Sequence, residues 1–125
     1  MPEPTLSTTA ADPGSGSYDL FDLHERRELD PAGVRPTLLL DRPGLKVLRL
    51  GLLPGQRMQT HDHTGCHVTV QCLSGTAAVE LDGETVKLAP GQLLCFAGES
   101  RVSPGNGGES ECSMLITLVD RRAAR

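Results

Sequence analysis

The chain has 125 residues, a length that suits a single domain with one hydrophobic core. Only 2% of the residues are aromatic, so the core must be aliphatic, and the chain lacks the stacking platform that binds single-stranded nucleic acid. The formal net charge of −4 offers no basic face to a phosphate backbone. No stretch approaches the roughly 20 apolar residues of a membrane-spanning helix. We therefore expect neither a nucleic-acid partner nor a membrane partner.

The N-terminus and the cysteines favour a cytoplasmic location. The chain begins Met-Pro-Glu, without the apolar run of a secretory signal. The four cysteines show no CxxC spacing and are too sparse for a secreted disulfide framework. Cys66 lies within a histidine-rich loop, where it is either a loop thiol or a soft metal ligand. The other three lie in or beside strand-like runs and are expected to be buried thiols: Cys72, Cys95 and Cys112.

The first 33 residues divide into two parts. Residues 1–17 are rich in Pro, Ser, Thr, Gly and Ala and cannot bury enough apolar surface to offset the entropy of ordering, so we predict a disordered arm. Residues 18–33 form an N-terminal segment. It is either a short helix capped by Asp19 or Asp22, or an irregular arm that packs its Leu and Phe side chains on a partner subunit. We expect His24 to be solvated or locally bonded rather than a ligand.

From residue 34 to residue 120 the chain is a series of short apolar runs separated by turn residues, and a basic tail follows at 121–125. Asp82-Gly83 is the strongest hairpin signal. Residues 98–104 are expected to form a loop with a short strand at most, and 105–108 a flexible turn. This spacing predicts an all-β fold, an antiparallel barrel or double-sheet jelly roll, whose closure removes sheet edges. The expected strands are 35–41, 45–53, 56–63, 67–73, 76–81, 84–88, 92–97 and 112–119.

Three of the four histidines lie within seven residues: His61, His63 and His67. On a strand, His61 and His63 point to the same face because side chains alternate with period two, and His67 can join them from the next strand. Three imidazoles with open positions suit a divalent metal that acts as a Lewis acid or redox centre. The alternative is a polar turn with solvated His61 and His63, followed by His67 as a satisfied polar residue at a strand start.

The pattern Gly55-x5-His61-x-His63-x3-His67 resembles the first conserved motif of the cupins, in which Gly, two His and a Glu or Gln hold a divalent metal. The hairpin at Asp82-Gly83 and the run that follows it resemble the linking strands and the start of the second cupin motif. The resemblance covers residues 45–119. It implies a small single-domain, RmlC-like antiparallel double-stranded β-helix (jelly-roll barrel), commonly a homodimer, with its ligand site inside the barrel.

The chain departs from the cupin pattern in both motifs. His67 stands where the family has an acid or an amide, and Gly75 falls one residue late, so another alignment puts Val68 in the ligand position. In the second motif, Arg101 or Val102 stands where the family has its metal-binding histidine. The fourth ligand that the resemblance implies is therefore absent.

Two functions from different classes remain open. In the first, His61, His63 and His67 hold zinc, iron, manganese or nickel, and the protein binds or acts on a small organic molecule. If it is an enzyme, the resemblance implies an oxygenase, isomerase or lyase, for which the sequence assigns no catalytic residue. Water, Cys66 or Glu99 would fill a further metal position.

The second function is a non-catalytic small-molecule sensor or regulatory binding module with a vestigial metal site. In this hypothesis, Arg101 is a candidate ligand-binding residue that supplies a positive charge to a carboxylate or phosphate. The alternative for Arg101 is a plain solvent-facing loop residue.

Overall fold

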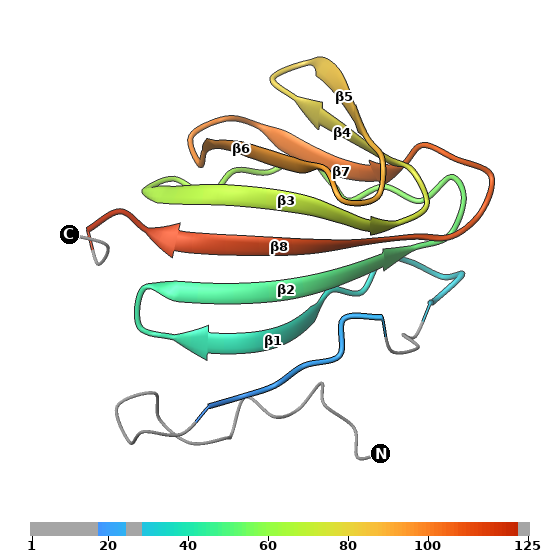
Figure 1. The fold of residues 1–125 in the computed structure, drawn as a ribbon. Helices are drawn as coiled ribbons and strands as arrows, with labels where there is room; N and C mark the ends of the chain where they lie inside the picture. The colour runs from blue at the N-terminus through green and yellow to red at the C-terminus, as the bar shows by residue number, and fades with distance from the viewer. Residues whose placement is uncertain (1–17, 25–28, 123–125) are drawn as a thin grey trace.

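The computed structural model describes residues 18–24 and 29–122, and these form eight antiparallel strands without a helix (Figure 1). The described part of the chain thus contains no helix that could cross a membrane. The predicted all-β jelly roll is confirmed, whereas the predicted disordered arm (1–17) and the last three residues of the basic tail lie outside the described residues. The strands are β1 (Thr37–Arg42), β2 (Leu45–Leu52), β3 (Cys66–Ser74), β4 (Ala77–Leu81), β5 (Glu84–Leu88), β6 (Leu93–Ala97), β7 (Val102–Asn106) and β8 (Cys112–Asp120).

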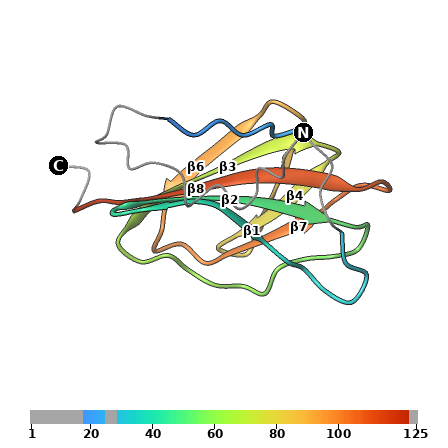
Figure 2. The ribbon, with the colours of Figure 1, turned by 90° about the horizontal axis from the view of Figure 1, so that it is seen from below.

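The strands form two sheets that face each other. The larger sheet has the order β1-β2-β8-β3-β6, and the smaller has the order β5-β4-β7. Seen from below, the small sheet and the 53–65 loop lie on one side of the large sheet, and residues 18–24 lie on the other (Figure 2). Residues far apart in sequence therefore meet between the sheets, as the jelly-roll prediction requires.

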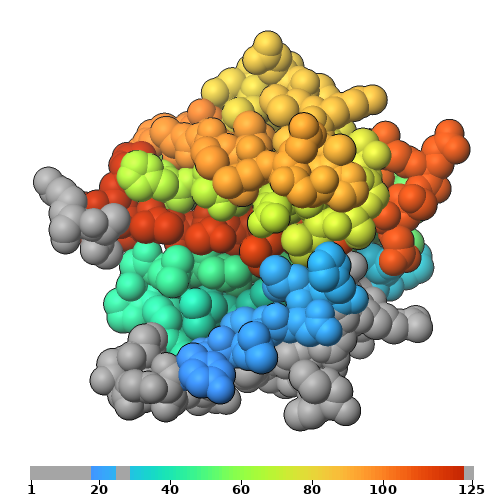
Figure 3. Space-filling view, viewed as in Figure 1, coloured from blue at the N-terminus to red at the C-terminus, as the bar shows by residue number. Residues whose placement is uncertain are grey.

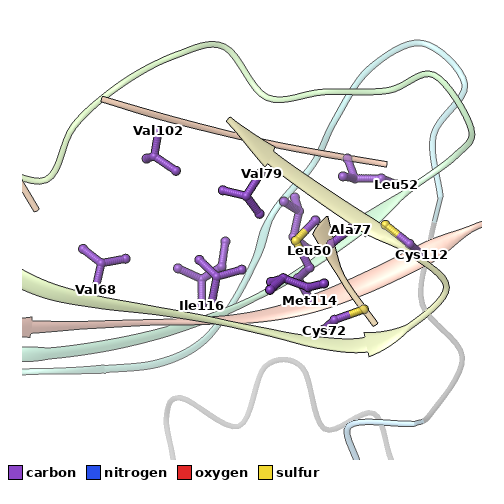
Figure 4. Packing of buried hydrophobic residues seen from close by; sticks show 12 residues of the cluster. Leu50, Leu52, Val68, Cys72, Ala77, Val79, Val102, Cys112, Met114 and Ile116 are labelled. Carbon is purple, nitrogen blue, oxygen red and sulfur yellow. The ribbon is translucent and has the colours of Figure 1, made fainter. Parts of the chain in front are cut away.

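The core lies between the two sheets and is aliphatic, as the composition predicts (Figure 4). Leu50 of β2 and Met114 of β8 are both 0% exposed and occupy paired positions in the ladder. Val79 of β4 covers them from the small sheet and is also 0% exposed. Burial of each large aliphatic side chain contributes about 1.5–3 kcal/mol relative to leaving it exposed.

Two of the three cysteines expected in the core are there. Cys72 and Cys112 are buried, so burial raises the pKa of both thiols, to about 11 for Cys112. The prediction for Cys95 is wrong, because this residue is exposed. On β6 the barrel-facing positions belong to Leu94 and Phe96, so alternation turns Cys95 outward.

The described residues 18–24 are irregular and contain no helix. They lie against the outer face of the large sheet, over β1 and β2 (Figure 3). The carboxylate of Asp19 accepts a hydrogen bond from Arg42 of β1 at 3.0 Å, and both side chains are largely buried. This ion pair attaches the segment to the sheet, while Leu20 remains exposed.

Two segments differ from the sequence prediction. Residues 56–63 do not form a strand; they reach the edge of β7 only through isolated bridges at Arg57 and His61. Conversely, β7 continues through Pro104 and Gly105, where a loop and a flexible turn were expected. Proline is tolerated because β7 is the last named strand of its sheet, and glycine at position 105 leaves room for the Arg57 guanidinium, whose carbon lies 2.4 Å from where a Cβ would be.

Candidate functional site

His61 faces the barrel because its backbone pairs with Val102 of β7. The two residues exchange both backbone hydrogen bonds, at 3.0 and 2.8 Å, and cross-strand partners point to the same face. Val102 is only 2% exposed and belongs to the core. The Nδ1 atom of His61 lies 2.7 Å from the carbonyl oxygen of Gln59, which can only accept. Nδ1 therefore carries a proton and donates to this oxygen, which leaves Nε2 as the ring nitrogen that faces other partners.

His63 lies beside His61. The two ring centroids are 4.7 Å apart with an interplanar angle of 87°, an edge-to-face contact. Burial, and next the nearby His61, lower the pKa of His63, and Asp62 only partly offsets this effect. His63 is therefore a neutral imidazole at pH 7, with one nitrogen that donates and one that accepts.

His67 does not join this pair. On β3 the barrel-facing residues are Val68, Val70 and Cys72, all buried, so His67 lies on the exposed outer face. The reason is the pairing of β3 with β8, which sets Val68 opposite Leu118 on the core side and leaves His67 on the other face. Val68, the next residue along β3, points inward instead. It occupies the ligand position in the alternative alignment of the first cupin motif.

In the second cupin motif, too, a valine stands at the inward position of a metal ligand. Val102 points into the barrel, as does Val68 (Figure 4). Arg101 turns outward: its side chain is 60% exposed, and its NH1 atom lies 3.5 Å from a carboxylate oxygen of Asp62. Arg101 therefore lines neither of the two hollows described below.

The donor set does not match a resident metal centre. Such a centre needs three or four protein ligands, whereas the barrel-facing positions here provide two imidazoles and two valines. Within residues 18–24 and 29–122, no group of three or more His, Cys, Asp or Glu side chains is placed to hold a metal ion. Glu99, a candidate for a further ligand position, is committed to an ion pair with Arg121.

A carboxylate clamp holds the histidine loop in place. Glu99 accepts hydrogen bonds from Arg121 through both of its oxygens, and it also accepts the backbone N–H of Gly65 at 3.0 Å. These bonds, chiefly those from Arg121, lower the pKa of Glu99 to about 2. Arg121 also donates to the carbonyl oxygen of Cys66 at 3.2 Å. Sequence reasoning missed this role, because Arg121 was expected only as the first residue of the basic tail at 121–125.

The position of His63 depends on close backbone packing at Gly98. The His63 N–H donates to the Gly98 carbonyl oxygen at 2.7 Å, and the Gly98 N–H donates to the Cys66 carbonyl oxygen at 2.8 Å. A Cβ atom at position 98 would lie 1.9 Å from the His63 carbonyl oxygen. Only glycine permits this approach.

The histidine pair lies between two hollows. The larger, the His61 hollow, has a volume of about 690 Å³ and lies between residues 31–34 and residues 55–61. The smaller, the His63 hollow, has a volume of about 320 Å³ and lies at the barrel end formed by the β1–β2 turn and the ends of β3 and β8. Each ring lines one hollow, and the rings contact each other, so a ligand in either hollow can reach an imidazole.

The fold and the sequence together identify the family. A family model described as a cupin domain matches residues 48–118, and the chain belongs to this family. No curated protein matches the chain. The jelly-roll prediction and the recognition of a small RmlC-like cupin are thus confirmed.

Solved structures share this fold at low sequence identity. A protein from Thermus thermophilus is 21% identical with a TM-score of 0.77, covering 82% of this chain and 98% of that chain. A predicted oxalate decarboxylase from Thermotoga maritima is 21% identical with a TM-score of 0.64, covering 69% and 79%. The cupin domain of an XRE family transcriptional regulator from Enterobacter cloacae is 22% identical with a TM-score of 0.60, covering 69% and 93%.

We expect Gly98→Ala to displace the histidine loop. The new methyl group meets the His63 carbonyl oxygen, so the substitution should lower the free energy of unfolding by about 1–3 kcal/mol, the usual effect of overpacking. Urea unfolding measures the change. Gly33→Ala is the matched control, because a Cβ there meets nothing within 4 Å, and it should change stability by no more than about 0.5 kcal/mol. Equal effects of the two substitutions would contradict the packing argument.

The lowered pKa of His63 predicts acid sensitivity. The folded state resists protonation at His63, whereas the unfolded chain takes up the proton near the ordinary pKa of 6.5. The stability contributed by the neutral ring is complete above pH 6.5 and is lost as the pH falls through the folded-state pKa. NMR titration of the ring should give a midpoint below 6.5, and His63→Asn should reduce the loss of stability between pH 7.5 and pH 5. A midpoint above 6.5 would show that the ring is not desolvated.

Proposed function

We propose that this cupin is a small-molecule binding module, a sensor or regulatory domain, that works without a resident metal. One observation carries the proposal. His61 and His63 meet edge to face between two hollows, while Val68 and Val102 fill the other two barrel-facing positions of the cupin motifs. The polar groups that remain can bind an organic ligand, but they are too few to enclose a metal.

The chemistry of the pair suits hydrogen bonding to a ligand. The Nδ1 proton of His61 is directed to the Gln59 carbonyl oxygen, so Nε2 is the ring nitrogen left to meet a ligand. Neutral His63 offers one donor and one acceptor. Apolar walls with a few convergent polar groups are the usual composition of a small-molecule site, and both hollows fall in the usual size range of roughly 300–1,000 Å³.

The similarity to the cupin domain of a transcriptional regulator supports a binding role at the level of the fold. Its identity of 22% carries the comparison no further than the shared architecture. The homodimer and the cytoplasmic location expected from the sequence remain predictions.

A second candidate is a metal-dependent enzyme of the oxygenase, isomerase or lyase type. The feature that favours it is the adjacency of two imidazoles, of which His63 is held neutral and so can offer a lone pair to zinc, iron, manganese or nickel. If the protein is such an enzyme, a bound ligand or water would occupy the metal-coordination positions that Val68 and Val102 cannot fill.

A thermal-shift screen of small organic molecules on the full chain, with and without a chelator, separates the two candidates. The metal-independent proposal predicts that a ligand raises Tm equally in both conditions, since a ligand at 100 times its Kd stabilises the folded state by about 2.7 kcal/mol. The shift should disappear in the double variant His61→Ala, His63→Ala. His67→Ala is the matched control and should retain the shift, because His67 lies on the outer face.

A shift that the chelator abolishes and that one divalent metal restores would overturn the proposal and support the enzyme. Retention of the shift in the double histidine variant would show that the ligand binds elsewhere.

A further inference from the structure

The His63 hollow has a charged group that the proposed function does not use. Lys46 of β2 lines it, and Lys46 pairs in the ladder with Leu118 of β8. Cross-strand partners share a face, and Leu118 packs against the core, so Lys46 projects from the barrel side of the sheet at its open end. The ammonium group can therefore reach over the hollow while its carbon stem lies along the wall.

Lys46 differs from the other charged residues around this hollow. Arg42 is paired with Asp19 at 3.0 Å, and the Asp120 carboxylate is paired with the Arg122 guanidinium at 3.8 Å. No ion pair joins Lys46 to a carboxylate anywhere in residues 18–24 and 29–122. Lys46 thus brings to the wall of the hollow an ammonium group that no carboxylate of the described residues contacts.

Asp41 is the carboxylate that faces Lys46 across the strand pair. It lies opposite Lys46 in the β1–β2 ladder, but it is exposed and does not line the hollow. The ammonium group can point either to solvent beside Asp41 or into the hollow. A negatively charged ligand would favour the second position.

We propose that the His63 hollow binds the carboxylate group of a small organic acid, with the Lys46 ammonium as its counter-charge and the His63 imidazole as a hydrogen-bond donor. This inference rests on the proposed function and names its ligand class. Leu118 and the Cys66 side of the hollow would contact the apolar body of the acid. A volume of about 320 Å³ accommodates a small acid rather than a large cofactor.

The donors favour a carboxylate over a phosphate. Phosphate sites use several convergent donors, commonly a bidentate guanidinium or the N–H groups of a helix N-terminus. Here the guanidinium of Arg42 is engaged by Asp19, and the described residues contain no helix. One ammonium and one imidazole match a group with a single charge and two oxygens.

The test uses the full chain labelled with 15N and pairs of probes that differ only in charge: acetate with acetamide, and benzoate with benzamide. The probes are titrated at constant ionic strength, and two-dimensional NMR follows the backbone amides. We expect the carboxylates to shift the amides of Gly44 and Cys66 at the hollow, while Gly83 on the β4–β5 hairpin does not move. The neutral amides should bind about tenfold more weakly, because hydrogen bonds to a charged group are stronger than neutral ones.

The chain offers a matched control in its other lysine. Lys46→Met should weaken carboxylate binding about tenfold and leave the neutral probes unchanged, whereas Lys87→Met removes the same charge from β5 and should leave both unchanged. Equal affinity of the carboxylates for wild type and Lys46→Met would overturn the proposal. Inorganic phosphate that binds the hollow more tightly than the carboxylates would overturn the ligand class.

The outcomes also separate this inference from the proposed function. If acid and amide bind the hollow equally in all three proteins, the barrel is a binding module without charge recognition, and only the inference fails. If a chelator abolishes binding of every probe, the metal-independent function itself fails.

Discussion

The pairing of β3 with β8 is the constraint on which the candidate site depends. Val68 lies opposite Leu118 and Val70 opposite Ile116, so the even-numbered residues of β3 face the core. A shift of one residue would expose these valines and bury His67, at a cost of about 1.5–3 kcal/mol for each large apolar side chain lost from the core. Burial along the whole strand therefore outweighs any preference of one histidine for the barrel.

Most of the fold could be predicted from the sequence because its signals are local. Alternation in β2 and the Asp-Gly turn between β4 and β5 depend on residues within a few positions of each other. Two features that the sequence did not predict depend on contacts between residues far apart in the chain. Gly105 belongs to a strand because it pairs with Ala78 of β4, and no local pattern shows that contact. The same holds for Arg121, whose carboxylate partner is 22 residues away.

The candidate site was predictable only in part. The adjacency of His61 and His63 follows from their spacing, although they lie on a segment held by isolated bridges rather than on a strand. The sequence does not show which residues of β3 face the core, because the loop between His63 and Cys66 can place either His67 or Val68 inward. The pairing of β3 with β8 places Val68 inward, and the turn in which the Cys66 N–H donates to the His63 carbonyl oxygen joins the histidine pair to this strand. The metal site expected from the resemblance thus becomes a pair of imidazoles in an apolar barrel.

A zinc titration of wild type, His67→Ala and Val68→His tests this account most directly. Val68→His adds a third imidazole on the inner face, and we expect it to gain one tightly bound zinc ion per chain, since three histidines suffice for a zinc site with one open position. Wild type and His67→Ala should behave alike and bind no stoichiometric metal. Stoichiometric zinc in wild type that is lost in His67→Ala would show that His67, not Val68, faces the barrel, and would contradict the account.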